Sequence, residues 1–278
     1  MIKIYTPNYR CNLSIKKSLQ LFFNEIIKYK NYIFTSIYSD IISKYKQDNF
    51  GLLWSVILPI VPMSLYLLLA SIKAFKKSED MPYIFYITIG MMIWLLMSEI
   101  IVTTMKSLRK NKKILLKSNF PFSVVYISSI GELLVNMFIR LIFVIIIMIT
   151  FSIHIDILNL FLTIFALTPI IIFAFSFGII LSISDIYIPD TKRLVDMFLR
   201  YGLFLSSVIF PFPKDGILGF LNQFNIFNTF VESVRSVLYF GTIYNYIGYT
   251  VFSIISIILF TIAIFIMLKI EFKVRSGL

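Results

Sequence analysis

The chain has 278 residues, of which 59% are hydrophobic and 14% charged, and its formal net charge is +12. A soluble domain is about 45–50% apolar and about 25% charged, so this composition excludes an ordinary soluble protein and indicates an integral membrane protein. The basic residues fall in short clusters between apolar runs, which excludes the continuous basic face expected of a nucleic-acid-binding protein.

The N-terminal segment mixes apolar and basic residues. From 15 to 44, apolar residues such as Leu19 and Phe22 recur at helical spacing among lysines. This pattern is typical of an amphipathic helix in the membrane interface, with its apolar face toward the acyl chains and its lysines toward anionic headgroups. We therefore expect residues 1–50 to form a cytoplasmic segment with an interface helix, ahead of a membrane domain over 51–278. An open alternative is that the same helix also binds a cytoplasmic partner.

Six apolar runs then follow that are long enough to cross a bilayer. A spanning helix needs about 20 largely apolar residues to cross roughly 30 Å of hydrocarbon. The runs are 52–70, 83–105, a stretch within 124–151, 158–182, 196–211 and 246–268. Residues 211–245 are only moderately apolar and contain proline and glycine, which favours re-entrant or interfacial helices between the last two spans. The predicted fold class is an all-α integral membrane protein with six transmembrane helices.

The orientation follows from the placement of the basic residues. Six spans put both termini on the same side of the membrane, and most of the 26 Lys and Arg residues lie in segments on that side. Cytoplasmic segments near spans carry an excess of Lys and Arg. We therefore predict that both termini are cytoplasmic.

Glu99, Glu132 and Arg140 are ionisable residues inside the predicted spans. A charge in the bilayer costs several kcal/mol unless it is paired or hydrated. Glu132 and Arg140 share a helix face without touching, because eight residues separate them by roughly 12 Å. We interpret Glu99 and Arg140 as a buried ion pair between two spans, with a proton-coupling site as the alternative.

The chain contains few residues of the kinds that bind metals or nucleotides. Its single histidine and single cysteine cannot build a metal cluster of usual spacing. The phosphate-binding motif G-x-x-x-x-G-K-[ST] does not occur in the sequence. We therefore expect no metal site and no cofactor in this chain.

Five stretches carry recognisable motifs. In chain order they are "YKQDNFGLLWSVILP", "MPYIFYITIGMMIW", "LLKSNFPFSVVYIS", "DIYIPDTKRLVDMFLRYGLFLSSVIFPFP" and "LNQFNIFNTFVESVRSVLYFG". Together they resemble the ABC-2 type permeases that export polysaccharides, which are the membrane subunits for O-antigen, capsule and teichoic acid. The resemblance covers nearly the whole chain from about residue 20.

The resemblance implies a function and partners. Such permeases are multi-pass proteins of the bacterial cytoplasmic (inner) membrane that form a homodimer and dock two copies of a separate ABC ATPase. The ATPase binds ATP and Mg, so this chain would be a transport subunit and no enzyme by itself. Its cargo would be a lipid-linked polysaccharide, as in lipopolysaccharide biosynthesis. Two alternatives stay open: an ABC-2 exporter of a drug, lipid or peptide, and a membrane-embedded enzyme acting on lipid-linked sugars.

The resemblance also implies roles for particular residues. Residues that would couple to the ATPase lie in the loop 107–121: Lys112, Lys113, Leu116, Lys117, Phe120 and Pro121. Aromatic residues that would line the channel, where sugar C–H faces pack on rings, are Trp54, Tyr66, Phe198, Tyr201 and Phe204. Basic residues that would attract the anionic lipid headgroup are Lys44, Lys46 and Arg193. Polar residues of the expected outer gate are Asn225 and Arg235.

Overall fold

The computed structural model describes residues 14–47, 60–61, 64–65, 68, 81–117, 120–153, 156–211 and 216–277. Within these ranges the regular structure is helical and there is no strand. The predicted first span, 52–70, lies almost wholly outside the described residues, together with the predicted channel residues Trp54 and Tyr66. The side chains of Lys44, Lys46 and Lys117 also lie outside what the structure describes.

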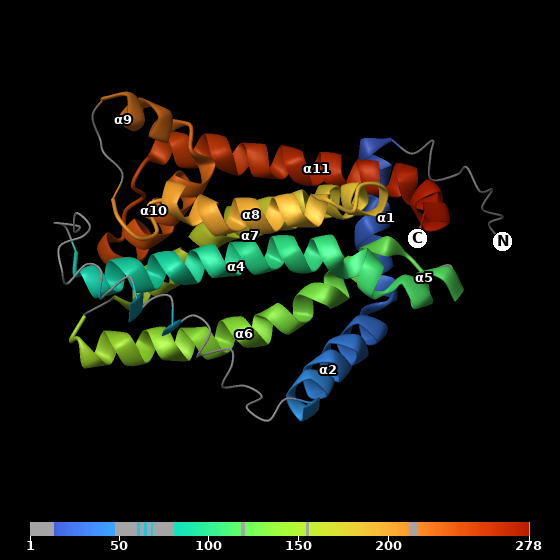
Figure 1. The fold of residues 1–278 in the computed structure, drawn as a ribbon, viewed down its shortest axis with the longest axis horizontal. Coiled ribbons are helices and arrows are strands. Elements are labelled where there is room, and N and C mark those ends of the chain that lie inside the picture. The colour runs from blue at the N-terminus through green and yellow to red at the C-terminus, as the bar shows by residue number, and fades with distance from the viewer. Residues whose placement is uncertain are drawn as a thin grey trace.

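Four long helices run side by side through the molecule (Figure 1). They are α4 (Tyr83–Lys110), α6 (Phe122–Thr150), α7 (Ile157–Tyr187) and α11 (Tyr246–Gly277). Helices α4 and α7, and α11 over Tyr246–Glu271, are long and apolar enough to cross a membrane. Helix α6 contains two shorter apolar stretches, Phe122–Gly131 and Arg140–Thr150. The predicted spans 83–105, 158–182 and 246–268 are therefore confirmed as apolar helices of spanning length, and the total of six spans stays a prediction.

Helix α7 lies at the centre of the bundle and packs against both α4 and α11. Its core side chains, such as Ile170 and Ile179, are fully buried. Pro169 interrupts its hydrogen-bond ladder, because proline has no N–H to donate to the carbonyl of Phe165. The Thr168 hydroxyl donates to that carbonyl instead, at 2.6 Å, so the helix passes through the proline without an unpaired oxygen there.

The N-terminal segment forms two helices, α1 (Ile15–Lys28) and α2 (Lys30–Gln47), where the sequence predicted a single helix over 15–44. The break falls at Tyr29, whose N–H still bonds the carbonyl of Glu25 at 3.0 Å. Helix α1 crosses the ends of the long helices (Figure 1) and packs against α6 and α11. Phe22 is buried there beside Phe260, with 6.0 Å between the ring centroids. Much of the apolar face that predicted an interface helix therefore contacts protein.

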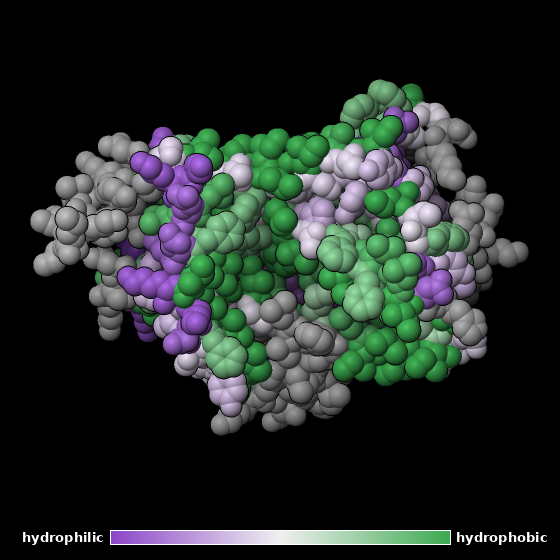
Figure 2. Space-filling model, turned by 180° about the vertical axis from the view of Figure 1, so that it is seen from behind, coloured by the Kyte–Doolittle hydropathy of each residue, from purple (hydrophilic) through white to green (hydrophobic). Residues whose placement is uncertain are grey.

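Hydrophilic side chains gather in a band at the end of the molecule where α5 and the last turns of α11 lie, and apolar side chains cover the middle (Figure 2). Isoleucines such as Ile142 on α6 and Ile258 on α11 are exposed as well. A polar end followed by a broad apolar belt is the surface expected of a protein that sits across a lipid bilayer.

The predicted fifth span, 196–211, differs from the structure. Helix α8 (Thr191–Gly202) begins earlier and ends at Gly202, and a short 3-10 turn, η2 (Leu203–Leu205), follows. The chain then bends at Ser207, which has a φ of 52°. Residues 206–211 do not continue the helix, and side chains of neighbouring helices hydrogen-bond the carbonyls of Ser207 and Ile209 there.

Two short helices, α9 (Gly216–Gln223) and α10 (Ile226–Phe240), lie between α8 and α11 at the end of the bundle away from the chain ends (Figure 1). Helix α10 packs against α4, α7 and α11. The expected helices of the 211–245 segment are thus present as helices, and their re-entrant position in a membrane stays a prediction.

Candidate functional site

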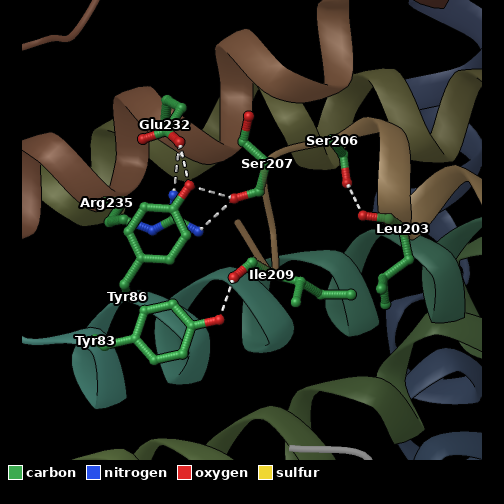
Figure 3. A network of polar contacts seen from close by, with 8 residues as sticks. All are labelled: Tyr83, Tyr86, Leu203, Ser206, Ser207, Ile209, Glu232 and Arg235. Atoms are coloured by element: carbon green, nitrogen blue, oxygen red, sulfur yellow. Dashed lines mark hydrogen bonds and ion pairs between the residues drawn. The ribbon is translucent and has the colours of Figure 1, made fainter. Parts of the chain in front are cut away.

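The polar centre of the 211–245 segment is Arg235 on α10, whose side chain is 0% exposed. Its guanidinium group donates to Glu232 Oε1 at 2.8 Å and to the Ser207 carbonyl at 3.1 Å (Figure 3). It also stacks on the ring of Tyr86 from α4, with 3.5 Å between Cζ and the ring centroid. One cation therefore joins α4, α10 and the segment that follows α8.

The tyrosines of α4 complete this network. The Tyr86 hydroxyl lies 2.7 Å from the Ser207 carbonyl oxygen and 2.8 Å from Glu232 Oε1. The Tyr83 hydroxyl donates to the Ile209 carbonyl at 2.8 Å (Figure 3). Gly90, one turn further along α4, makes room for Arg235, because a Cβ there would lie 2.2 Å from Arg235 Nη2. The side chains and carbonyl groups of this network therefore pack closely against α4.

Asn225 begins α10 and ties it to the end of α8. Its Oδ1 accepts hydrogen bonds from the N–H groups of Phe227 and Asn228, both at 3.1 Å, which caps the helix. Its Nδ2 donates to the Leu205 carbonyl. The two predicted gate residues thus lie on one helix, and each contacts the segment that follows α8.

The predicted coupling loop contains a separate short helix, α5 (Lys112–Lys117), directly after α4. Lys112 and Lys113 are exposed, and the apolar side chain of Leu116 is 52% exposed. The neighbouring Leu115 is buried instead. One side of α5 therefore packs on the protein while the other presents lysines and a leucine to the outside.

The C-terminal end of α11 holds α5 in place from one side through hydrogen bonds. Arg275 Nη1 donates to the Leu115 carbonyl at 2.6 Å, and Nη2 donates to the Phe120 carbonyl. Glu271 accepts from the same guanidinium at 2.8 Å, and the group also lies over the Phe122 ring, 5.1 Å from its centroid. Arg275 thus holds main-chain atoms at both ends of the turn that leads from α5 to α6.

The N-terminal helices fasten the same turn from the other side. Tyr29 and Tyr32 pack on the Phe120 ring, with centroid separations of 5.2 and 4.4 Å. Glu25 of α1 is buried and accepts a hydrogen bond from the Ser123 hydroxyl at the start of α6. A carboxylate is favourable at this place because the N-terminal end of a helix carries a partial positive charge. Contacts from the N-terminal helices α1 and α2 and from helix α11 therefore position α5 and the turn that follows it.

Comparison with protein families identifies the family to which the chain belongs. The model of the family described as ABC-2 type transporter matches residues 32–239, well over half of the chain. The chain belongs to the ABC-2 type transporter family. No individual curated protein matches it. The chain is therefore a permease subunit of an ABC transporter and a multi-pass membrane protein, and permeases of this family normally work with an ATPase subunit.

The predicted channel residues that the structure describes lie on the exposed side of α8 and of η2, which follows it directly: Phe198 and Tyr201 are on α8, and Phe204 is on η2. Tyr201 is 61% exposed, and Phe198 and Phe204 are also exposed. Leu194 and Leu205 extend the same apolar face along the helix. The Phe198 ring also contacts Phe227 of α10, with 5.7 Å between the centroids. An exposed aromatic face on a helix of the bundle is a surface that a second subunit or a cargo can contact.

The predicted headgroup residue Arg193 lies in the first turn of α8, and its side chain is 88% exposed. It reaches Asp190 at 3.2 Å, an exposed pair that contributes little to stability. Its predicted partners Lys44 and Lys46 lie on α2. Because the side chains of these two lysines are not described, the structure does not test a contact among the three residues.

Glu99 on α4 and Arg140 on α6 lie side by side in this permease. Arg140 Nη1 donates to Glu99 Oε2 at 2.9 Å, and Nη2 donates to Oε1 of the same carboxylate. This two-bond geometry is the strong form of an arginine–carboxylate pair. Arg140 is buried while Glu99 keeps some exposure, which is the arrangement of an ion pair at the margin of a helix bundle.

Sequence reasoning missed several residues that organise these sites. Tyr86 and Glu232 were not selected, although Glu232 precedes Arg235 by three residues, a spacing that lets side chains meet on a helix. The sequence did not single out Arg275 either. It also did not single out Asp185 at the end of α7, whose Oδ2 lies 2.6 Å from Arg109 Nε on α4.

Proposed function

We propose that this chain is the membrane subunit of an ABC exporter that moves a lipid-linked polysaccharide across the bacterial cytoplasmic membrane. Two copies form a homodimer and dock two copies of a cytoplasmic ATPase, which binds ATP and Mg. Both termini face the cytoplasm. The observation that supports the cargo best is the exposed aromatic face of α8, formed by Phe198, Tyr201 and Phe204.

An aromatic face suits a moving sugar chain for a physical reason. The C–H faces of sugar rings pack on aromatic rings, and rings without charge hold no single sugar unit in a deep energy well. In the proposed dimer, α8 of each subunit lines the pathway together with the first span, where Trp54 and Tyr66 lie. Arg193, Lys44 and Lys46 attract the diphosphate of the lipid anchor at the cytoplasmic surface.

The coupling to ATP hydrolysis is assigned to α5. Its exposed side chains Lys112, Lys113 and Leu116 form a small basic and apolar surface. This surface lies at the end of the molecule that the proposed topology places in the cytoplasm. The buried Leu115 and the hydrogen bonds from Arg275 support this role. A helix that transmits movement of the ATPase to the membrane helices must be held firmly against them.

The test uses the permease purified with its ATPase and reconstituted in liposomes. The probes are a polyprenyl diphosphate that carries an oligosaccharide and the same polyprenyl diphosphate without sugar. We expect the sugar-bearing lipid to stimulate ATP hydrolysis several-fold more than the bare lipid. Equal stimulation by both lipids would overturn the polysaccharide assignment and favour an exporter of lipids.

Variants of α8 locate the pathway. Replacing Phe198, Tyr201 and Phe204 together by alanine should abolish the stimulation by the sugar-bearing lipid. Phe165→Ala is the matched control, because Phe165 is an exposed phenylalanine of α7 that lies outside the proposed pathway. If the triple variant kept full stimulation, α8 would not line the pathway.

A further inference from the structure

A pocket of about 840 Å³ opens between three segments at the end of the bundle away from α1. The end of α9, the first turn of α10 and the residues that lead into α11 form its walls. In the proposed topology this is the outer end of the permease. We propose that the pocket binds neutral sugar units of the cargo after they leave the α8 pathway; the inference rests on the proposed function.

Amide side chains supply the polar groups of the pocket. Asn222, Gln223, Asn228 and Asn245 all line it. Asn228 is only 2% exposed, and the side-chain oxygens of Asn222 and Asn228 have no hydrogen-bond partner among the described residues. Buried polar atoms are almost always hydrogen-bonded in folded proteins. Unsatisfied amide oxygens in the wall of a pocket therefore point to a ligand that brings hydroxyl donors.

Aromatic rings supply the apolar groups. Phe224, Tyr244 and Tyr246 line the same pocket, and all three side chains are largely exposed. Carbohydrates have a polar rim of hydroxyls and apolar C–H faces, so amides and flat rings together match both parts of a sugar.

The described lining of the pocket carries no charged side chain, which disfavours other classes of ligand. No Asp, Glu, Lys or Arg belongs to the described lining, so a metal ion finds no carboxylate there and a phosphate finds no cation. The N-terminal end of α10 does not replace a cation, because Asn225 Oδ1 already accepts from the N–H groups of Phe227 and Asn228. A neutral, hydroxyl-rich ligand is the class that fits.

The pocket is also joined to the proposed pathway. Phe227, next to Asn228 in the chain, contacts the Phe198 ring of α8. Asn225 donates to the Leu205 carbonyl at the end of the same apolar face. Contacts of Asn225 and Phe227 therefore link the α8 face to the first turn of α10, which forms one wall of the pocket.

The experiment places the photoreactive amino acid p-benzoylphenylalanine at position 244 in the complex with the ATPase. Phe151 is the control position, because it is an exposed aromatic residue at the end of α6, on the same end of the bundle, and does not line the pocket. The probes are maltohexaose and an oligogalacturonate of the same length. We expect cross-linking of maltohexaose at 244 to exceed that at 151 by at least fivefold, and the charged oligosaccharide to cross-link poorly at both.

A substitution in the wall tests the unsatisfied amides. Asn228→Leu keeps the branching and the number of side-chain heavy atoms and removes the hydrogen-bonding groups, so it should weaken maltohexaose cross-linking at 244 roughly tenfold. The thermal midpoint of the variant shows whether it is folded. Cross-linking that is equal at 244 and 151, or a cross-link from 244 to a second copy of the permease, would overturn the sugar site.

The two proposals fail in different ways. If the wild-type complex responds to the sugar-bearing lipid but no sugar is captured at 244, the pocket proposal is wrong and the proposed function stands. If the complex does not respond and maltohexaose is still captured at 244, the export function is wrong and the pocket is a sugar site of another kind. Absence of both results overturns both.

Discussion

Arg275 of α11 donates a hydrogen bond to the main-chain carbonyl of Leu115 in α5, across 160 positions of the sequence. The same guanidinium bonds the Phe120 carbonyl and Glu271. The last membrane helix therefore holds the helix that we assign to ATPase docking, and the two elements are expected to move together.

Replacing Arg275 tests that coupling. Arg275→Gln loses the charge-assisted bonds to two carbonyls, each contributing about 1.5–3 kcal/mol. We expect the complex to assemble with its ATPase but to lose most of the stimulation of ATP hydrolysis by cargo. Lys16→Gln, which removes an exposed charge at the same end of the molecule, is the control. Unchanged stimulation in Arg275→Gln would show that the bonds do not transmit the signal.

Leu116 tests the docking surface itself. Its side chain is exposed on α5, so Leu116→Glu is expected to leave the fold intact and to prevent co-purification of the ATPase. Ile27→Glu, at an exposed apolar position of α1, provides the comparison. Retention of the ATPase by Leu116→Glu, measured by size-exclusion chromatography of the complex, would place the docking surface elsewhere.

Arg235 is expected to be a strong determinant of stability. Arg235→Met leaves Glu232 with its charge unpaired in a mostly buried position, which costs about 3–5 kcal/mol. The thermal midpoint of the purified permease should fall clearly. Adding Glu232→Gln should recover part of the loss, since it removes the unpaired charge. Arg193→Met is the contrast, because its pair with Asp190 is exposed and contributes at most about 1 kcal/mol.

Gly90 should not tolerate even one added methyl group. A Cβ there would lie 2.2 Å from Arg235 Nη2 and 2.8 Å from the Val208 carbonyl oxygen, so the network in Figure 3 would have to shift. We expect Gly90→Ala to destabilise the fold by about 1–3 kcal/mol. Gly202→Ala, whose Cβ would meet only the Trp94 ring at 3.0 Å, should be milder. The order of the two thermal midpoints checks this prediction.

The pair of Glu99 and Arg140 separates a structural role from proton coupling. Arg140→Met should lower the thermal midpoint, and the double variant with Glu99→Gln should recover it, because a matched pair of neutral side chains leaves no charge unpaired. If the double variant folds normally but its transport no longer depends on pH as in the wild type, the pair takes part in proton coupling.

Much of the membrane architecture was predictable because apolar runs of sufficient length have few other uses. Helices α4, α7 and α11 follow from hydropathy alone. The short helix α10 was anticipated only as part of a segment of uncertain form, although Asn225 at its start and Gly241 at its end are typical capping residues. Gly241 has a φ of 74°, which glycine adopts without strain.

The polar contacts between distant segments were not predictable. The sequence selects Arg235 as a gate residue, but nothing local in the sequence indicates that Tyr86 supplies a ring to cover it. The end of α8 was placed too late for a similar reason, since the bend at Ser207 depends on hydrogen bonds from other helices. No proline or glycine lies near Tyr29, so the sequence gives no local signal for the helix break there.

The network around Arg235 has a consequence for biogenesis. Tyr86 is synthesised 121 residues before Ser207 and 146 residues before Glu232, so its hydroxyl gains both partners only after α6 and α7 have been made. Glu232 and Arg235, by contrast, are made almost together and neutralise each other within one helical turn. Helix α10 therefore arrives with this pair already neutralised and completes the bundle late, and translation arrested before α10 should leave Tyr86 uncovered although α4 can already pack on α6 and α7.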